Sequence, residues 1–87
     1  MIVSIDGGCP GVKNIQEGIL DATAMQFPIK MAIDGVDAIS EFAKTGTRPT
    51  ATKGLDYFNT GVQLITNEPV KGVKSVTAKT GLAMCWG

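Results

Sequence analysis

Short apolar runs alternate with glycine- and proline-rich breaks in the first third of the chain. Met1–Ile5 is an apolar run that ends at Asp-Gly-Gly, which predicts a strand buried on both faces, as in a parallel sheet. Pro10 suits the first turn of a helix and Gly18 suits its end. A second apolar run, Ile19–Met25, predicts another strand. Strand, short helix and strand in this order are typical of a right-handed βαβ unit with parallel strands.

The clearest helical pattern in the chain begins at Pro28. Its apolar residues recur at three- and four-residue steps and form one stripe, made by Ile29, Ala32, Ile33, Val36, Ile39, Phe42 and Ala43. Lys44 and Gly46 predict the end of this helix. Alternating apolar and polar positions then predict a third strand over Tyr57–Thr66, and one helical turn is expected near Leu82. The pattern indicates an α/β chain with the order βαβ-α-β.

The predicted elements do not provide enough cover for the long helix. Its apolar stripe is wide, whereas the predicted sheet is narrow, so part of the core is missing and a partner chain could supply it. Met1 also stands directly at the head of the first strand, with no residues leading in. Because terminal residues usually fray, we expect residues 1–87 to form a single truncated domain whose true start lies upstream.

Composition and charge fit a folded globular chain and exclude several classes of protein. The chain has 44% hydrophobic and 18% charged residues, and its eight basic and eight acidic residues cancel. These charges are scattered, so no basic stripe is available for nucleic acid or an anionic membrane. No apolar run is long enough to span a bilayer, and the N-terminus lacks the pattern of a signal peptide.

The two cysteines, Cys9 and Cys85, favour a disulfide rather than catalysis. The chain has no histidine, which excludes a Cys–His nucleophile and the usual zinc ligands. A disulfide between them would stabilise the fold by about 4 to 5 kcal/mol and implies an oxidising compartment. Two free thiols in a cytosolic protein remain the alternative. We find no paired carboxylates for acid–base chemistry, and therefore expect neither an enzyme nor a metal or cofactor site.

Asp6 and Gln26 occupy equivalent places, because each directly follows the last apolar residue of a predicted strand. Ligands of open α/β sheets bind outside the carboxyl ends of the strands, and adjacent parallel strands would put these residues side by side. A carboxylate and an amide suit the hydroxyls of a polyol. From spacing alone, the simpler interpretation is still that Asp6 belongs to a turn or cap and Gln26 to a loop.

Four segments together resemble a known family: VSIDGGCPGVKNIQEG, ILDATAMQFP, YFNTGVQLITNEPVKGVKS and the terminal CWG. They resemble the C-terminal part of periplasmic sugar-binding proteins of bacterial ABC importers, with a ribose-binding-protein-like fold and closest to the fructose-binding type. The resemblance implies an incomplete lobe of a type I periplasmic-binding-protein fold with parallel strands. Residues 1–26 would form a βαβ of the C-terminal lobe, residues 27–56 a helix and loop of the opposite lobe, and residues 57–87 the returning strand and tail.

The resemblance also implies a function for the two strand-end residues. In the family, an Asp and a Gln at these positions bind sugar hydroxyls, so Asp6 and Gln26 become ligand-binding candidates. The implied parent is a periplasmic protein that binds a monosaccharide, such as the hexose fructose, and passes it to a membrane ABC permease. We hold two alternatives: a self-associating module, forming a homodimer or a domain-swapped oligomer, and the effector-domain remnant of a LacI-type sugar-responsive repressor.

Overall fold

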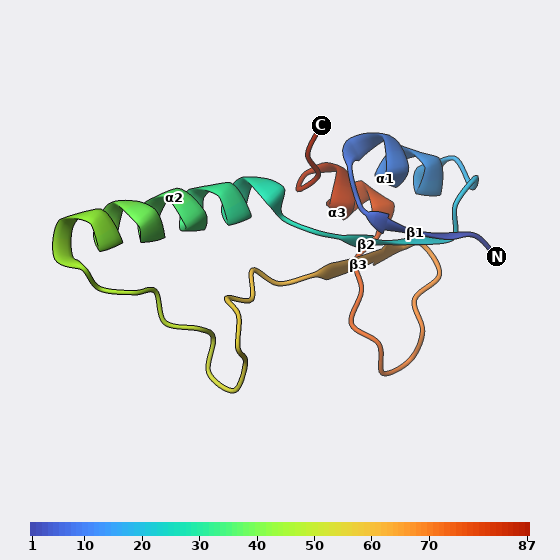
Figure 1. Ribbon diagram of the computed structural model, residues 1–87. Helices are drawn as coiled ribbons and strands as arrows, with labels where there is room; N and C mark the ends of the chain where they lie inside the picture. The colour runs from blue at the N-terminus through green and yellow to red at the C-terminus, as the bar shows by residue number, and fades with distance from the viewer. The chain divides into compact units, whose positions relative to one another are not determined.

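The computed structural model describes all residues from 1 to 87, and they form two compact units (Figure 1). Unit 1 consists of Met1–Gln26 and Val62–Gly87, and unit 2 consists of Phe27–Gly61. The chain passes from unit 1 to unit 2 after Gln26 and returns at Val62. Each unit is described by itself.

Unit 1 contains a three-stranded mixed sheet with the order β1-β2-β3. The strands are β1 (Val3–Asp6), β2 (Ala22–Met25) and β3 (Gln63–Thr66). β1 and β2 are parallel, as the βαβ pattern predicted, but β3 is antiparallel to β2, so the expectation of parallel strands throughout is wrong. β3 runs in the opposite direction because the chain re-enters unit 1 beside the end of β2, where Gln63 lies opposite Met25.

Two short helices cover one face of this sheet. They are α1 (Cys9–Gln16), which has Pro10 in its first turn as predicted, and α3 (Ala78–Leu82), the expected helical turn near Leu82 (Figure 1). Apart from two glycines, the buried residues of unit 1 come from these helices, from β2 and from β3: Val12, Ile15, Thr23, Met25, Ile65, Thr66 and Ala78. The core of unit 1 is therefore thin and lies on one side of the sheet only.

No helix of unit 1 covers the other face of the sheet. Ser4 bonds to buried Thr23 on the covered side, so Val3 and Ile5 point to the opposite side, where they are 60% and 70% exposed. The expectation that the first strand is buried on both faces is thus wrong in this chain. An edge strand of a sheet covered on one face only cannot bury both of its faces, although its sequence is typical of strands that do.

Unit 2 is built around one long helix, α2 (Pro28–Thr45). As predicted, it starts at Pro28 and ends at Gly46, whose φ of 72° is left-handed and whose N–H donates to the Phe42 carbonyl at 2.8 Å. However, no residue of Phe27–Gly61 is buried, and the apolar stripe of α2 is exposed. Unit 2 therefore has a well-formed helix but no core.

The segment before β3 is a loop rather than a strand. The prediction of a strand over Tyr57–Thr66 holds only for Gln63–Thr66 and is wrong for residues 57–62. There the Asn59 side chain accepts the N–H of Gly61 at 2.8 Å, and Thr52 accepts the N–H of Asn59 at 2.9 Å. These local side-chain bonds satisfy the backbone without a neighbouring strand.

Candidate functional site

The ends of β1 and β2 bring Asp6 and Gln26 together at the backbone. Asp6 is the last residue of β1 and lies opposite Met25, the last residue of β2. Gln26 follows immediately, and its backbone N–H donates to the Asp6 carbonyl at 3.1 Å. Because the two strands are parallel, both residues lie at the same edge of the sheet, which is the edge where α/β folds bind ligands.

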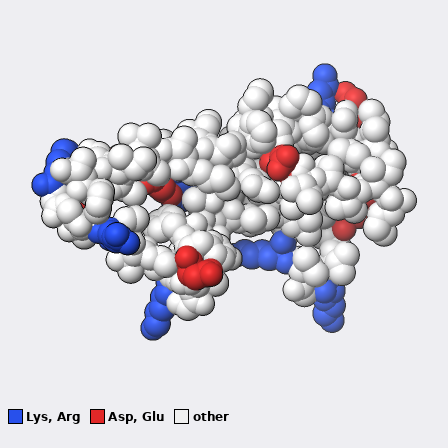
Figure 2. All heavy atoms as spheres, viewed as in Figure 1, with Lys and Arg blue, Asp and Glu red and all other residues white.

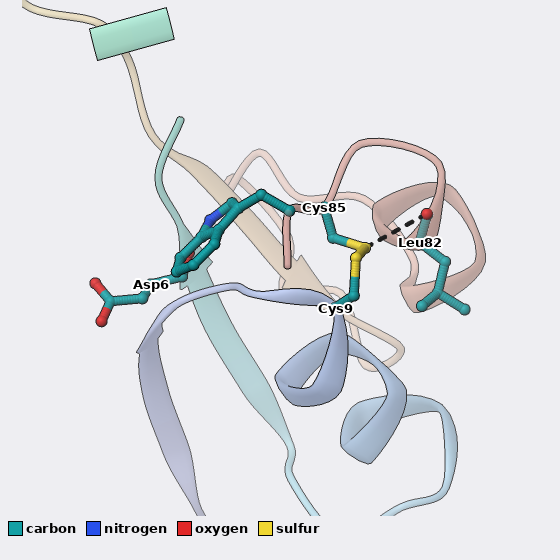
Figure 3. Close-up of a disulfide and its surroundings, with 5 residues drawn as sticks. Asp6, Cys9, Leu82 and Cys85 are labelled. Carbon is teal, nitrogen blue, oxygen red and sulfur yellow. Dashed lines mark hydrogen bonds between the residues drawn. A yellow bond between two sulfur atoms is a disulfide. The ribbon is translucent and has the colours of Figure 1, made fainter. Parts of the chain in front are cut away.

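The polar groups of both side chains have no hydrogen-bonding partner within the protein. Asp6 is exposed and Gln26 is half-buried, and neither the carboxylate nor the amide forms a hydrogen bond or ion pair. Figure 3 shows the Asp6 carboxylate pointing away from the disulfide. Asp6 does not cap α1 either, since Gly8 is the capping residue and no side chain bonds there. Asp6 is therefore not a cap, but it does lie in the turn between β1 and α1, so its simpler interpretation as a turn residue stays open.

The backbone at Asp6 has an unusual conformation. Its φ of 88° makes it the single non-glycine residue of the chain with a positive φ. A left-handed conformation costs an L-residue about 1 to 2 kcal/mol, and such residues cluster at functional sites when the surroundings fix them. The next residue, Gly7, has a φ of 64° and is buried, and a Cβ there would lie 2.5 Å from the Cβ of Met25. Only glycine fits between the two strand ends.

The C-terminal residues pack beside this turn. Cys9 and Cys85 form the disulfide that the sequence favoured, with their Cα atoms 5.0 Å apart (Figure 3). The Cys9 N–H donates to the Trp86 carbonyl at 2.8 Å, and the indole N–H of Trp86 donates to the Asp6 carbonyl at 3.2 Å. No pattern in the sequence indicates a contact between Asp6 and Trp86, because the two residues are 80 positions apart.

Other parts of the chain offer less to a ligand. A groove of about 520 Å³ in unit 2 runs between α2 and the segment after it, and its lining includes Met31, Asp34, Phe58 and Thr60 but neither strand-end residue. No three Cys, Asp or Glu residues are grouped as metal ligands. None of the helices combines the length and apolarity needed to cross a membrane. Basic and acidic side chains are dispersed over the face shown in Figure 2.

Comparison with protein-family models, with curated proteins and with solved structures found no significant match. The comparisons therefore show no family for this chain, and the small mixed α/β fold is established from its own structure.

Proposed function

We propose that this chain is part of a periplasmic binding protein that holds a monosaccharide, such as the hexose fructose, and delivers it to an ABC permease without chemical change. The observation that carries the proposal is the pairing of Asp6 and Gln26. The ends of two parallel strands place the backbones of Asp6 and Gln26 next to each other, and neither side chain forms a hydrogen bond or ion pair within the protein.

The chemistry of these two groups suits a sugar. A carboxylate accepts hydrogen bonds from two neighbouring hydroxyls, and a primary amide both donates and accepts. The resemblance to sugar-binding proteins assigns hydroxyl contacts to the same two positions. The chain has no histidine that could act beside them as a general acid or base, and the proposal includes no catalysis.

The uncovered surfaces support an incomplete lobe of a type I periplasmic-binding-protein fold. Parallel strands are usually covered by helices on both faces, but Val3 and Ile5 of β1 are exposed. Under the proposal, a second helix layer covers that face, and α2 belongs to the opposite lobe. A second lobe would also close over the sugar, because a site with one wall leaves its polar contacts in competition with water.

The disulfide supports a periplasmic location over a cytosolic one. Cys9 and Cys85 are bonded to each other, and such bonds persist mainly in oxidising compartments. A LacI-type repressor acts in the reducing cytosol, so this bond favours the binding protein over the repressor. The proposal includes no cofactor and no nucleic-acid partner.

The proposal is tested by titrating the isotopically labelled chain with fructose, ribose and related sugars while NMR spectra are recorded. We expect the Gln26 side-chain amide and the backbone resonances of Asp6 to shift, with a Kd on the order of 1 mM or weaker because one wall of the site is open. Asp6→Asn preserves shape and tolerates the same backbone conformation, so its effect reports the charge.

We expect Asp6→Asn to weaken fructose binding by at least about tenfold, as loss of a charged hydrogen bond requires. Asp56→Asn is the matched control, because it removes the same charge from an exposed loop of unit 2. If no sugar shifts the Asp6 and Gln26 signals, or if both variants respond alike, the proposed site is wrong.

A second candidate function is self-association, as a homodimer or a domain-swapped oligomer. The observation that favours it is the absence of any buried residue in unit 2, whose helix exposes Ile33, Val36 and Ile39 by 55% to 71%. A stretch of this size cannot fold stably without burying such a surface, and a second copy of the chain is one way to cover it.

A further inference from the structure

We propose that Cys9, Cys85 and Trp86 form a latch that holds Asp6 in its ligand-binding conformation. In this C-terminal latch, Trp86 is a positioning residue that acts on Asp6 through the backbone and does not itself contact the ligand. The effect on sugar affinity rests on the proposed function, whereas the effect on the conformation of Asp6 does not.

The first step is the double hydrogen bond at the Asp6 carbonyl. This oxygen accepts the Gln26 N–H at 3.1 Å and the Trp86 indole N–H at 3.2 Å, so both of its acceptor positions are used. Donors from two different segments fix the peptide plane between Asp6 and Gly7. This peptide plane directly follows Asp6, whose φ of 88° is left-handed. Such a conformation persists only when the surrounding structure supports it.

The second step is the anchoring of Trp86 itself. Its carbonyl accepts the Cys9 N–H at 2.8 Å, and its neighbour Cys85 is covalently bound to Cys9. Trp86 packs directly over Gly8, since a Cβ there would lie at van der Waals distance from it, 3.4 Å from the Trp86 carbonyl oxygen and 3.8 Å from Cη2 of its ring. Both the backbone and the side chain of Trp86 are therefore hydrogen-bonded to the turn that begins at Asp6.

The third step links this anchor to the binding site. The direction of the Asp6 side chain follows from its φ, so a return to negative φ would turn the carboxylate to another side of the strand. The left-handed conformation is disfavoured for an L-residue by an amount comparable to the contribution of one hydrogen bond, so the loss of one donor shifts the equilibrium away from this conformation. Without the latch, Asp6 and Gln26 would stay adjacent along the sheet, but the Asp6 carboxylate would leave the position in which the proposed site uses it.

The test uses Trp86→Phe in the 87-residue chain, because phenylalanine keeps an aromatic ring and the disulfide but removes the indole donor. Met84→Leu is the control, since Met84 lies in the same segment, is 39% exposed and has no contact with the turn in the hydrogen-bond network. We expect the ¹³Cα and ¹³Cβ shifts of Asp6 to move toward β values and the Gln26 amide to exchange faster in Trp86→Phe alone. Fructose affinity should fall by about three- to tenfold.

Reduction with dithiothreitol gives a second, independent measurement. The dithiol is oxidised to its cyclic disulfide while Cys9 and Cys85 become two thiols, and the indole N–H of Trp86 should then exchange faster while the Asp6 shifts move as in Trp86→Phe. If reduction unfolds the chain, the Trp86→Phe variant alone decides whether the latch holds the conformation of Asp6.

The outcomes separate the latch from the sugar site. Unchanged Asp6 shifts and an unchanged Gln26 exchange rate in Trp86→Phe overturn the latch, even if the unmodified chain binds fructose. If the Asp6 shifts respond but the unmodified chain binds no sugar, the latch stands and the proposed function fails.

Discussion

At the scale of single residues, the turn from β1 into α1 is the most demanding place in the chain. Asp6 and Gly7 both have a positive φ, and the backbone of Gly7 lies against Met25 of the next strand. The same turn orients the carboxylate on which the proposed function depends. The residue that most limits stability and the residue proposed to bind a ligand are therefore neighbours.

We expect Gly7→Ala to destabilise the fold by about 2 to 5 kcal/mol, because it adds left-handed strain to a steric clash with Met25. Gly11→Ala is the control, since a Cβ at this position of α1 meets nothing within 4 Å, and it should stabilise by up to about 1 kcal/mol. Urea denaturation of the three proteins measures both changes. Equal stabilities for the two variants would contradict the packing at Gly7.

At the scale of whole elements, α2 is a helix whose boundaries are specified by its own sequence but whose apolar face is not buried. Its boundaries follow from Pro28 and Gly46, and Lys30 and Asp34 pair on its surface at 2.5 Å. None of these features depends on a partner. Its stripe of exposed apolar residues does depend on one, and this is the basis for the second candidate function.

We expect the double variant Val36→Lys/Ile39→Lys to abolish self-association of the chain while changing the stability of unit 1 by less than about 0.5 kcal/mol. These side chains are 67% and 71% exposed and bury nothing within the chain, so charge there opposes only contacts with another copy. Size-exclusion chromatography with light scattering measures the mass. Glu41→Lys adds the same positive charge to an exposed position of the helix and is the control.

A monomeric mass for the unmodified chain at all concentrations would rule out self-association. A dimer that is unaffected by the double variant would place its interface elsewhere than on α2.

Elements specified by local signals were predicted correctly, and those specified by distant neighbours were not. Periodicity and capping residues were sufficient for α2, and the strand-helix-strand pattern was sufficient for the parallel pair. The burial of β1 was predicted wrongly, because burial depends on which segments cover a strand. The strand predicted from Tyr57 was interrupted by the bonds of Asn59 and Thr52, which alternation of apolar residues does not reveal.

The candidate site, too, was predictable only where local sequence signals determine it. The positions of Asp6 and Gln26 at neighbouring strand ends follow from the βαβ pattern. The left-handed φ of Asp6 and its bond to Trp86 do not, because they arise where the two ends of the sequence meet. The even number of cysteines was the one signal that pointed to this meeting.

At the scale of the whole molecule, a single covalent bond compensates for a small core. Only five hydrophobic residues of the chain are buried: Val12, Ile15, Met25, Ile65 and Ala78. The disulfide spans 76 positions and connects the first helix of the chain with its C-terminal end. Because it restricts nearly the entire unfolded chain, we attribute a large share of the stability to it.

We expect Cys9→Ser/Cys85→Ser to lower the free energy of unfolding by about 4 to 5 kcal/mol, as closure of a loop of this length predicts. For a domain with a typical stability of about 5 to 15 kcal/mol, this loss would leave a substantial unfolded population. Urea denaturation of the variant, compared with the unmodified chain with and without dithiothreitol, measures the difference. A variant as stable as the oxidised chain would show that the core alone suffices.

The disulfide also determines whether the fragments produced by a protease would separate. Lys53 lies in the exposed part of unit 2, and Cys9 and Cys85 lie on opposite sides of it along the chain. Hydrolysis of the peptide bond after Lys53 would produce two polypeptides that remain covalently linked, since the sulfur bridge joins them. The three strands and the Asp6 turn would survive such a nick, and only a reductant would release the halves.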